Sequence, residues 1–285
     1  MIDSATRLCC LIGHPVEHSV SPQMHNSAFR SLGLNYAYLA FDVPEDALEI
    51  AVKGLKALRA VGFNVTIPHK IRVMRLLDEL DESAERAGAV NTVANDRGAL
   101  KGYNTDVYGI ERALRKFRLP SSEQAMIIGA GGAARASIIA LLNLGFERIL
   151  IANRTLERAR SLAGWIRSMG FSAEACSLEE GRRRAETCGL IVNATPIGMH
   201  PDVDEAPLSR DEISRGSIVL DLVYNPPRTR LLEEAEKAGA RAISGIEVLV
   251  YQGAEAFKLW TGREAPIEIM REAALRALQE GEAER

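Results

Sequence analysis

The chain has 285 residues, of which 47% are hydrophobic and 26% are charged, as expected for a folded protein of about two domains. Its 35 lysines and arginines and 38 acidic residues give a formal net charge of −3, which excludes a predominantly basic nucleic-acid-binding protein. The four cysteines form no CxxC pair, the N-terminus shows no signal-peptide pattern, and no apolar run reaches the ~20 residues of a membrane span, so we expect a cytoplasmic protein that does not bind membranes.

Short apolar runs alternate with amphipathic stretches along the whole chain, which predicts parallel strands covered by helices. The expected strands are Leu8–Ile12, Tyr36–Val43, Phe63–Ile67, Ala125–Ile128, Ile149–Ala152, Leu190–Ala194 and Ile218–Leu222. The expected helices include Pro44–Leu58, Ala133–Leu144, Leu156–Met169, Ile246–Trp260 and Pro266–Glu280. Two extended runs within Val90–Gly102 flank the turn sequence Asp96-Arg97-Gly98, which predicts a hairpin.

A domain boundary is expected where a helix over Asp106–Arg118 ends at the breaker-rich sequence Leu119-Pro120-Ser121-Ser122. A new strand, glycine loop and helix follow, and the last two helices of the chain have no strand between them. We therefore expect an α/β protein with two domains and a cleft between them. The first is an N-terminal α/β domain of residues 1–107 and 246–285, and the second is a Rossmann-type doubly wound domain of residues 108–245.

The glycine loop after Ala125–Ile128 reads Gly129-Ala130-Gly131-Gly132-Ala133-Ala134 and matches the pattern G-x-G-x-x-A. In this pattern the first glycine permits a tight turn, the second lets the backbone approach a pyrophosphate, and the small last residue keeps the helix close to the strand. Free N–H groups and the positive end of the helix dipole then bind the phosphates. The loop predicts a dinucleotide site formed by Gly129, Ala130, Gly131, Gly132 and Ala133.

The residues after the next strand distinguish NAD from NADP. NAD sites usually have Asp or Glu here to bind the ribose 2′-hydroxyl, whereas this chain has Asn153-Arg154-Thr155, with Arg158 one helical turn later. Guanidinium groups bind a 2′-phosphate through charge-assisted hydrogen bonds, so the sequence predicts NADP as the cofactor. The alternative, in which Arg154 is only a surface residue, stays open at this stage.

Polar clusters occur at the ends of predicted strands in the first half, where open α/β sheets bind ligands. In the first cluster, Ser21 is expected to be a helix N-cap with Pro22 at the first helical position, whereas Ser19 has no such structural explanation. In the second, strand alternation turns Asn64 and Thr66 to the same face. A helix starting at Pro68 would then hold Lys70 near the end of this strand.

Two more clusters, Asn91-Thr92 and Asn104-Thr105-Asp106, follow along the chain. Taken alone, Asp106 can be a helix cap and Lys70 a solvated surface amine. The histidines and carboxylates show no metal-ligand spacing, so no metal site is expected.

Together these motifs resemble the successive signatures of the shikimate dehydrogenase family. In the first half the matching motifs are Ser19-x-Ser21-Pro22-x-Met24-His25-Asn26, Asn64-Val65-Thr66-Ile67-Pro68-His69-Lys70, Gly88-Ala89-Val90-Asn91-Thr92 and Gly102-Tyr103-Asn104-Thr105-Asp106. After the Gly129 loop and Asn153-Arg154-Thr155, they are Asn193-Ala194-Thr195-Pro196-Ile197-Gly198-Met199, Asp221-Leu222-Val223-Tyr224-Asn225-Pro226 and Leu249-Val250-Tyr251-Gln252-Gly253-Ala254. The resemblance extends from Leu11 to Gly262.

The resemblance implies reversible, NADPH-dependent reduction of 3-dehydroshikimate to shikimate, in the biosynthesis of aromatic amino acids through chorismate. It implies that Lys70 and Asp106 are the catalytic pair, with the lysine as proton donor. The substrate carboxylate would be held by Ser19, Ser21 and Tyr224, and the ring hydroxyls by Asn64, Thr66, Lys70, Asn91, Asp106 and Gln252. The cofactor site would also include Thr195, Leu222 and Gly245.

The sequence departs from the family pattern at two places. Val107 stands where the family often has glycine, and Glu247-Val248 replaces a common Gly-Met; neither change removes a group needed for the reaction. Two alternatives stay open: an NAD-linked quinate/shikimate dehydrogenase, which Asn153-Arg154 disfavours, and a non-catalytic NADP-binding regulator, which the presence of both Lys70 and Asp106 disfavours. The oligomeric state is also open, with a homodimer as one option.

Overall fold

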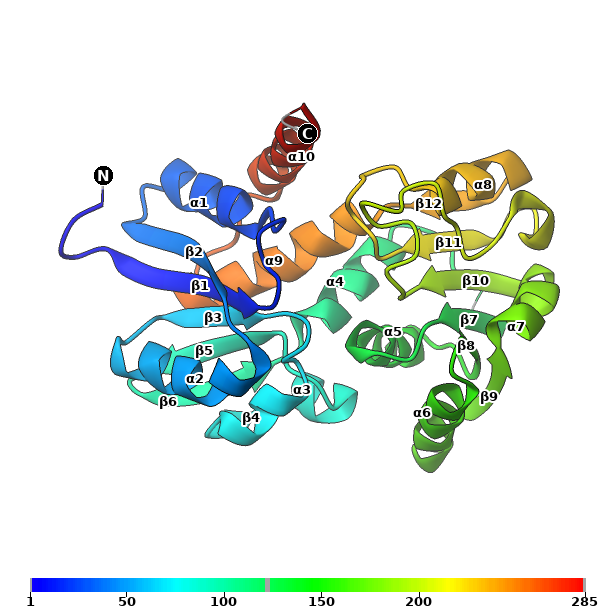
Figure 1. Cartoon of the computed structure of the whole chain (residues 1–285), viewed down its shortest axis with the longest axis horizontal. Coiled ribbons are helices and arrows are strands. Elements are labelled where there is room, and N and C mark those ends of the chain that lie inside the picture. The colour runs from blue at the N-terminus through cyan, green and yellow to red at the C-terminus, as the bar shows by residue number, and fades with distance from the viewer. Residues whose placement is uncertain (1, 121–123, 284–285) are drawn as a thin grey trace. The chain divides into compact units, whose positions relative to one another are not determined.

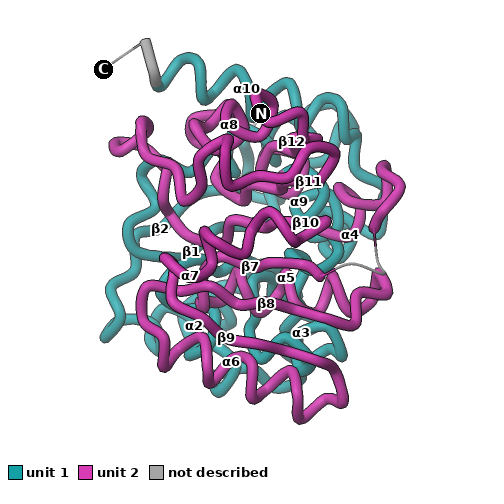
Figure 2. The backbone as a smooth tube through the Cα atoms, turned by 90° about the vertical axis from the view of Figure 1, so that its right-hand side faces the viewer, with its two compact units in different colours: residues 1–109, 250–285 teal, residues 110–249 magenta. Residues whose placement is uncertain are grey.

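The computed structural model describes residues 2–120 and 124–283, and its helices and strands are labelled in Figure 1. The chain forms two compact units, one of residues 1–109 and 250–285 and the other of residues 110–249 (Figure 2). The chain passes from one unit to the other within two helices, α4 (Thr105–Leu114) and α9 (Gly245–Thr261). Ser121 and Ser122 of the expected domain junction lie outside the described residues.

The first unit contains a mixed sheet with the strand order β2-β1-β3-β5-β6-β4. Its strands are β1 (Arg7–Gly13), β2 (Tyr36–Asp42), β3 (Gly62–Val65), β4 (Glu79–Leu80), β5 (Thr92–Asp96) and β6 (Ala99–Tyr103). β1 runs parallel to both β2 and β3, whereas β5 runs antiparallel to β3 and to β6. The antiparallel β5–β6 pair confirms the hairpin expected from the turn sequence at Arg97.

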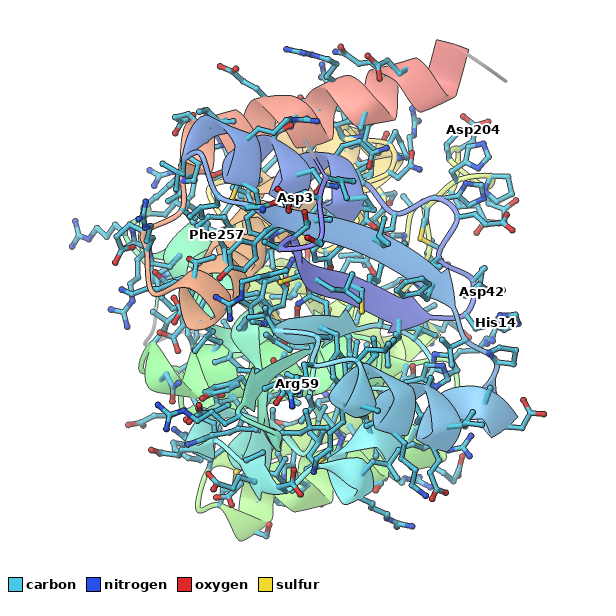
Figure 3. All side chains as sticks on the ribbon, turned by 90° about the vertical axis from the view of Figure 1, so that its left-hand side faces the viewer. Asp3, His14, Asp42, Arg59, Asp204 and Phe257 are labelled. Carbon is cyan, nitrogen blue, oxygen red and sulfur yellow. The ribbon has the colours of Figure 1, made fainter. Side chains whose placement is uncertain are left out.

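Helices pack on this sheet through apolar side chains. They are α1 (Ser21–Ser31), η1 (Glu45–Ala47), α2 (Leu48–Ala57), η2 (Arg72–Leu76), α3 (Glu82–Ala87) and the parts of α4 and α9 that belong to this unit, whereas α10 (Ile267–Ala283) packs on α1. In α2, Val52 and Leu55 are buried in one core cluster with Ile12 of β1. Phe29 of α1 stacks on Phe257 of α9, which is labelled in Figure 3, with 5.1 Å between ring centroids.

The second unit contains a wholly parallel sheet with the order β12-β11-β10-β7-β8-β9. Its strands are β7 (Gln124–Ile128), β8 (Arg148–Asn153), β9 (Ser172–Ser177), β10 (Cys188–Asn193), β11 (Ile218–Asp221) and β12 (Arg241–Ile243). Its helices include α5 (Gly132–Asn143), α6 (Leu156–Ser168), α7 (Leu178–Arg184), η3 (Ala185–Thr187), η4 (Arg210–Glu212) and α8 (Arg230–Ala238). Counted from β7, this is the doubly wound Rossmann order, so the expected fold class is confirmed.

Two local expectations are wrong. Ser21 is the first residue of α1 rather than its N-cap; Val20 occupies the cap position, and no side chain forms the capping hydrogen bond. No helix starts at Pro68, because a turn closed by a hydrogen bond from the N–H of His69 to the carbonyl of Thr66 precedes η2. Burial of the His69 ring, with Nε2 lying 2.6 Å from the carbonyl oxygen of Val43, stabilises this turn.

Candidate active site

The strand directions of the first unit bring its polar clusters to one edge of the sheet. The segment containing Ser19 follows β1, Asn64 lies near the end of the parallel strand β3, and these two strand ends therefore coincide. β5 is antiparallel to β3, so Asn91, just before β5, lies at the same edge. β6 returns antiparallel to β5 and delivers Asp106 there as well. The strand directions therefore bring residues that are distant in the sequence to the same edge of the sheet.

Lys70 and Asp106 form an ion pair at this edge, with 2.6 Å between Nζ and Oδ2. Their side chains are only 18% and 17% exposed, so the pair is largely shielded from water but still accessible to a ligand. The second carboxylate oxygen of Asp106 accepts a hydrogen bond of 2.8 Å from Nδ2 of Asn91. These contacts fix the carboxylate between an ammonium and an amide, and orient the ammonium beside it.

A buried hydrogen-bond network extends from this pair. The Thr105 hydroxyl lies 3.0 Å from Nδ2 and 3.2 Å from Oδ1 of Asn91, and Oε1 of Gln252 lies 3.3 Å from the same Nδ2. Thr92 lies 2.9 Å from the Thr105 hydroxyl and accepts a 2.9 Å hydrogen bond from Nδ2 of Asn64. Five of the expected site residues, Asn64, Lys70, Asn91, Asp106 and Gln252, therefore belong to one network that the sequence did not reveal.

The serines and Thr66 lie near the carboxyl ends of β1 and β3. The N–H of Ser21 donates to the Ser19 hydroxyl at 3.3 Å, so the two serines are adjacent. The loop after β1 is tied to the loop after β3, because the N–H of His14 donates to the Ile67 carbonyl at 2.9 Å. Ser21 is buried and its hydroxyl caps no helix, which leaves it available to a ligand.

In the second unit, the glycine loop is shaped by close backbone contacts. Gly129 has φ +117°, and a Cβ there would lie 2.8 Å from the carbonyl oxygen of Ala194. Gly131 is the N-cap of α5; no side chain caps this helix, and a Cβ on Gly131 would meet no atom within 4 Å. Open space in front of uncapped helix N–H groups fits a dinucleotide phosphate.

Neighbouring loops of the parallel sheet surround this glycine loop. Thr195, in the loop after β10, would lie 3.2 Å from a Cβ on Gly129. The N–H of Leu222 donates to the carbonyl of Asn193 at 3.0 Å, which joins the loops after β10 and β11. Gly245 packs so tightly on the latter loop that a Cβ would lie 2.6 Å from the Val223 carbonyl oxygen.

Two arginines follow β8 with exposed side chains. Arg154 comes directly after Asn153, whose amide donates to the Thr155 carbonyl at 2.9 Å, and Arg158 lies in the first turn of α6. Within the described part of the chain, neither arginine forms an ion pair. Two unpaired guanidinium groups next to a dinucleotide loop fit a 2′-phosphate, so the residues of this unit fit NADP.

Asp221 anchors the loop that carries Tyr224. Its buried carboxylate accepts hydrogen bonds from Asn193 Nδ2 at 2.9 Å, from the N–H of Val223 at 3.0 Å and from the Thr229 hydroxyl at 2.6 Å. Burial raises the pKa of Asp221 to about 6 despite these hydrogen bonds, and burial also raises the pKa of Tyr224. No pattern in the sequence indicated this anchoring role of Asp221.

The two departures from the family pattern are accommodated without disruption. Val107 is buried in α4, and its N–H lies 3.4 Å from Oδ1 of Asn104. Glu247 forms an ion pair of 2.8 Å with Lys116, and Val248 is buried.

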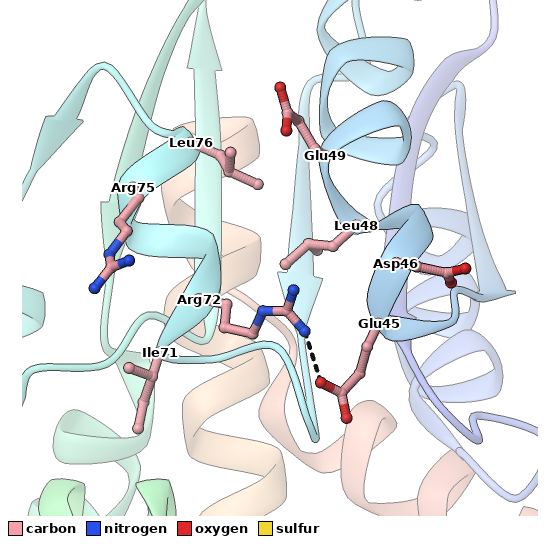
Figure 4. Close-up of a pocket in the computed structure, with 8 residues that line it drawn as sticks. All are labelled: Glu45, Asp46, Leu48, Glu49, Ile71, Arg72, Arg75 and Leu76. Carbon is pink, nitrogen blue, oxygen red and sulfur yellow. Dashed lines mark hydrogen bonds and ion pairs between the residues drawn. The ribbon is translucent and has the colours of Figure 1, made fainter.

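A separate pocket of about 290 Å³ lies between α2 and η2 in the first unit (Figure 4). It is lined by both acidic and basic side chains, and Arg72 and Glu45 form an ion pair of 2.6 Å there. None of the expected site residues lines this pocket.

Among the residues that the structure describes, no group of three or more histidines, cysteines and carboxylates could hold a metal ion. His14 forms an ion pair with Asp42, with 2.8 Å between Nδ1 and Oδ1 (Figure 3).

No helix in residues 2–120 and 124–283 is long and apolar enough to cross a membrane.

Comparison with known proteins gives consistent matches over most of the chain. Three family models match: "Shikimate dehydrogenase substrate binding domain" over residues 11–93, "Shikimate / quinate 5-dehydrogenase" over residues 111–222, and "Shikimate 5'-dehydrogenase C-terminal domain" over residues 245–275. A relative from Methanopyrus kandleri, named shikimate dehydrogenase (NADP(+)), is 56% identical over 284 residues, which cover 98% of each chain.

Two solved structures are also similar. A shikimate dehydrogenase in complex with NADP+ has a TM-score of 0.90 and 44% identity, with 98% of each chain covered. The shikimate 5-dehydrogenase of Thermus thermophilus in complex with NADP(H) and shikimate has a TM-score of 0.87 and 39% identity, covering 95% of this chain and all of that one (100%).

Proposed function

This chain belongs to the shikimate dehydrogenase family, and we propose that it catalyses the reversible NADPH-dependent reduction of 3-dehydroshikimate to shikimate. The observation that carries this proposal is the shielded Lys70–Asp106 pair, fixed by Asn91 at the edge of the sheet. The proposal assigns substrate binding to residues 1–107 and 246–285 and cofactor binding to residues 108–245.

The proposed catalytic role follows from the chemistry of the pair. NADPH, when bound, supplies the hydride. Negative charge then develops on the substrate carbonyl oxygen, and the ammonium of Lys70 can stabilise this charge and donate the proton. Asp106 holds the ammonium in place at 2.6 Å and can accept a hydrogen bond from the hydroxyl that forms. In the oxidative direction, neutral Lys70 would accept the proton.

We propose that neutral hydroxyl groups bind the substrate carboxylate, since Ser19, Ser21 and Tyr224 are the expected contacts and Ser21 is not used as a helix cap. Asn64, Thr66, Asn91 and Gln252, with the catalytic pair, are the proposed contacts for the ring hydroxyls.

We propose that NADP binds to the second unit through two groups of residues. The glycine loop and the segment after β8 form the first, namely Gly129, Ala130, Gly131, Gly132, Ala133, Asn153, Arg154, Thr155 and Arg158. Thr195, Leu222 and Gly245, in the neighbouring loops, form the second. The open space at Gly131 and the unpaired guanidinium groups support this assignment.

The test is a spectrophotometric assay of purified protein with shikimate or quinate, each combined with NADP+ or NAD+. We expect efficient turnover only with shikimate and NADP+. Equal turnover with NAD+ and quinate would instead identify the NAD-linked quinate/shikimate enzyme, and binding of NADP+ without turnover of either substrate would identify a non-catalytic regulator.

We also propose a cytoplasmic location, since the four cysteines are buried and form no disulfide bond within the described residues, as expected in a reducing compartment. The homodimer stays a prediction, which size-exclusion chromatography with light scattering tests.

A further inference from the structure

Tyr38 is a buried residue of β2 whose hydroxyl contacts one of the expected substrate-binding residues. Its side chain is 0% exposed, and its hydroxyl lies 2.7 Å from Oδ1 of Asn64. An amide oxygen can only accept a hydrogen bond, so the Tyr38 hydroxyl must be the donor. No motif in the sequence pointed to this contact, because it joins residues on two different strands.

The hydrogen bonds of Asn64 leave its amide little capacity for a ligand. Its Nδ2 donates to the Asn91 carbonyl at 3.2 Å and to the Thr92 hydroxyl at 2.9 Å, which uses both N–H groups. The Asn91 carbonyl cannot donate, so the amide cannot be turned around. One lone pair of Oδ1 accepts the hydrogen bond from Tyr38, and the second lone pair of Oδ1 is the position left for a ligand. A ligand that contacts this amide must therefore donate a hydrogen bond to it.

Three side chains from α1 and α9 hold Tyr38 in place. The amide of Asn26 donates to the Tyr38 carbonyl and accepts from its N–H, each at 2.8 Å, so it pairs with β2 like a neighbouring strand. The His25 ring stacks on the Tyr38 ring with 4.5 Å between centroids and 8° between planes, and Trp260 lies 6.0 Å away. His25 and Asn26 belong to the family motif but have no role in the proposed reaction, and these contacts with Tyr38 explain their presence structurally.

The orientation of Asn64 also reaches the catalytic pair. Thr92, which accepts from Asn64, lies 2.9 Å from the Thr105 hydroxyl. Thr105 contacts Asn91, and Asn91 donates to Asp106 at 2.8 Å. A change in the Asn64 amide would therefore disturb the donors and acceptors that hold Asn91.

We propose that Tyr38 is a positioning residue that holds Oδ1 of Asn64 in place as the hydrogen-bond acceptor for a substrate ring hydroxyl. The site then selects a ring hydroxyl that donates, and disfavours an analogue in which that position cannot donate. This proposal rests on the proposed function, because it assumes that a ring hydroxyl of shikimate meets Asn64.

The test compares Tyr38→Phe with Tyr36→Phe, a control on the same strand whose hydroxyl accepts a hydrogen bond from the exposed residue Arg7. We expect Tyr38→Phe to raise the KM for shikimate by about 3- to 10-fold, the effect of one lost hydrogen bond, without changing the KM for NADP+. Tyr36→Phe should leave both constants unchanged.

The second readout is selectivity among shikimate analogues in which each non-reacting ring hydroxyl is replaced by fluorine. Fluorine cannot donate a hydrogen bond, so the wild-type protein should lose about 10-fold in kcat/KM with one of these analogues. The loss should be smaller in Tyr38→Phe, because Oδ1 of Asn64 is then no longer held by the Tyr38 hydroxyl and meets the substrate hydroxyl less precisely. A purely structural role of Tyr38 would not alter this selectivity.

An equal selectivity in Tyr38→Phe and Tyr36→Phe would overturn the proposal, as would equal kcat/KM for shikimate and every fluorinated analogue in the wild-type protein. If Tyr38→Phe does not fold, Asn26→Ser is used instead, since it removes the contacts that hold the Tyr38 backbone; unchanged selectivity there has the same meaning. Failure of the wild-type protein to oxidise shikimate would instead refute the proposed function.

Discussion

Replacing Lys70 by alanine tests the proposed proton donor. Lys70→Ala removes the ammonium that lies 2.6 Å from Asp106 and leaves the hydrogen bond from Asn91 to that carboxylate in place. Positioned acid–base groups contribute about 100- to 10,000-fold to turnover, so kcat should fall by this factor, equivalent to about 3 to 5 kcal/mol of transition-state stabilisation. The KM for NADP+ should not change, because the proposed cofactor-binding residues lie in the other unit.

The matched control is Lys56→Ala, which breaks another lysine–aspartate pair of the first unit. Lys56 lies 2.8 Å from Asp78, but these side chains are 40% and 45% exposed and lie outside the proposed site. An exposed pair of this kind is worth about 0 to 1 kcal/mol, so Lys56→Ala should keep near wild-type turnover and stability. Thermal unfolding of both variants separates a folding defect from a catalytic one. Near wild-type kcat in folded Lys70→Ala would refute the proton-donor role.

Three further predictions concern the cofactor, the substrate carboxylate and the response to pH. Arg154→Ser should raise the KM for NADP+ by about 10- to 100-fold and leave that for NAD+ unchanged, and a parallel change in both would contradict 2′-phosphate binding. Ser19→Ala should raise the KM for shikimate alone; a change only in NADP+ affinity would refute carboxylate binding. Burial lowers the pKa of His25 from 6.5 to about 3, so the unfolded chain takes up a proton first as the pH falls. The free energy of unfolding should therefore decrease below pH 6.5, by at most about 1.4 kcal/mol per pH unit from this group, and urea unfolding of His25→Phe should show a weaker decrease.

Asp221 should contribute a pH dependence of the opposite sign. Its folded pKa of about 6 lies above the ordinary 3.8, so its contribution to stability is fully present below pH 3.8 and is lost as the pH rises through about 6. The stability of the wild-type protein relative to Asp221→Asn should therefore fall over this window, which urea unfolding at several pH values measures. A difference that is constant with pH would show that Asp221 has an ordinary pKa.

Local sequence patterns correctly predicted those elements and loops whose structure is determined by neighbouring residues in the sequence. The buried strands of the second unit were identified from continuous apolar runs, because a parallel sheet covered on both faces needs apolar side chains at nearly every position. The glycine loop was identified because its spacing reflects backbone geometry alone, and the predicted family is confirmed by the matching family models.

The two wrong local predictions, at Ser21 and at Pro68, concern segments whose structure depends on residues that are close in space but not adjacent in the sequence. The sequence Ser21-Pro22 satisfies the pattern of a helix start, but the helix begins one residue earlier than this pattern requires, with Val20 at the cap. The turn before η2 depends on burial of His69 against the carbonyl of Val43, 26 positions away in the sequence.

The hydrogen-bond network that joins Asn64 to Asp106 could not be predicted from the sequence for a related reason. Thr92 and Thr105 looked like ordinary polar residues within their motifs, and Tyr38 looked like a buried strand residue. Their roles arise from strand register and from side chains that meet across the sheet edge, which a single sequence does not specify.

Isotope transfer tests directly whether hydride passes between NADPH and 3-dehydroshikimate at the Lys70–Asp106 pair. The purified protein would be incubated with 3-dehydroshikimate and NADPH that carries deuterium at both C4 positions of the nicotinamide, and the product analysed by mass spectrometry. We predict shikimate that carries one deuterium on the reduced carbon in the wild-type protein and greatly reduced product in Lys70→Ala. Absence of shikimate in the wild-type reaction, or shikimate without deuterium, would contradict hydride transfer from NADPH at this site.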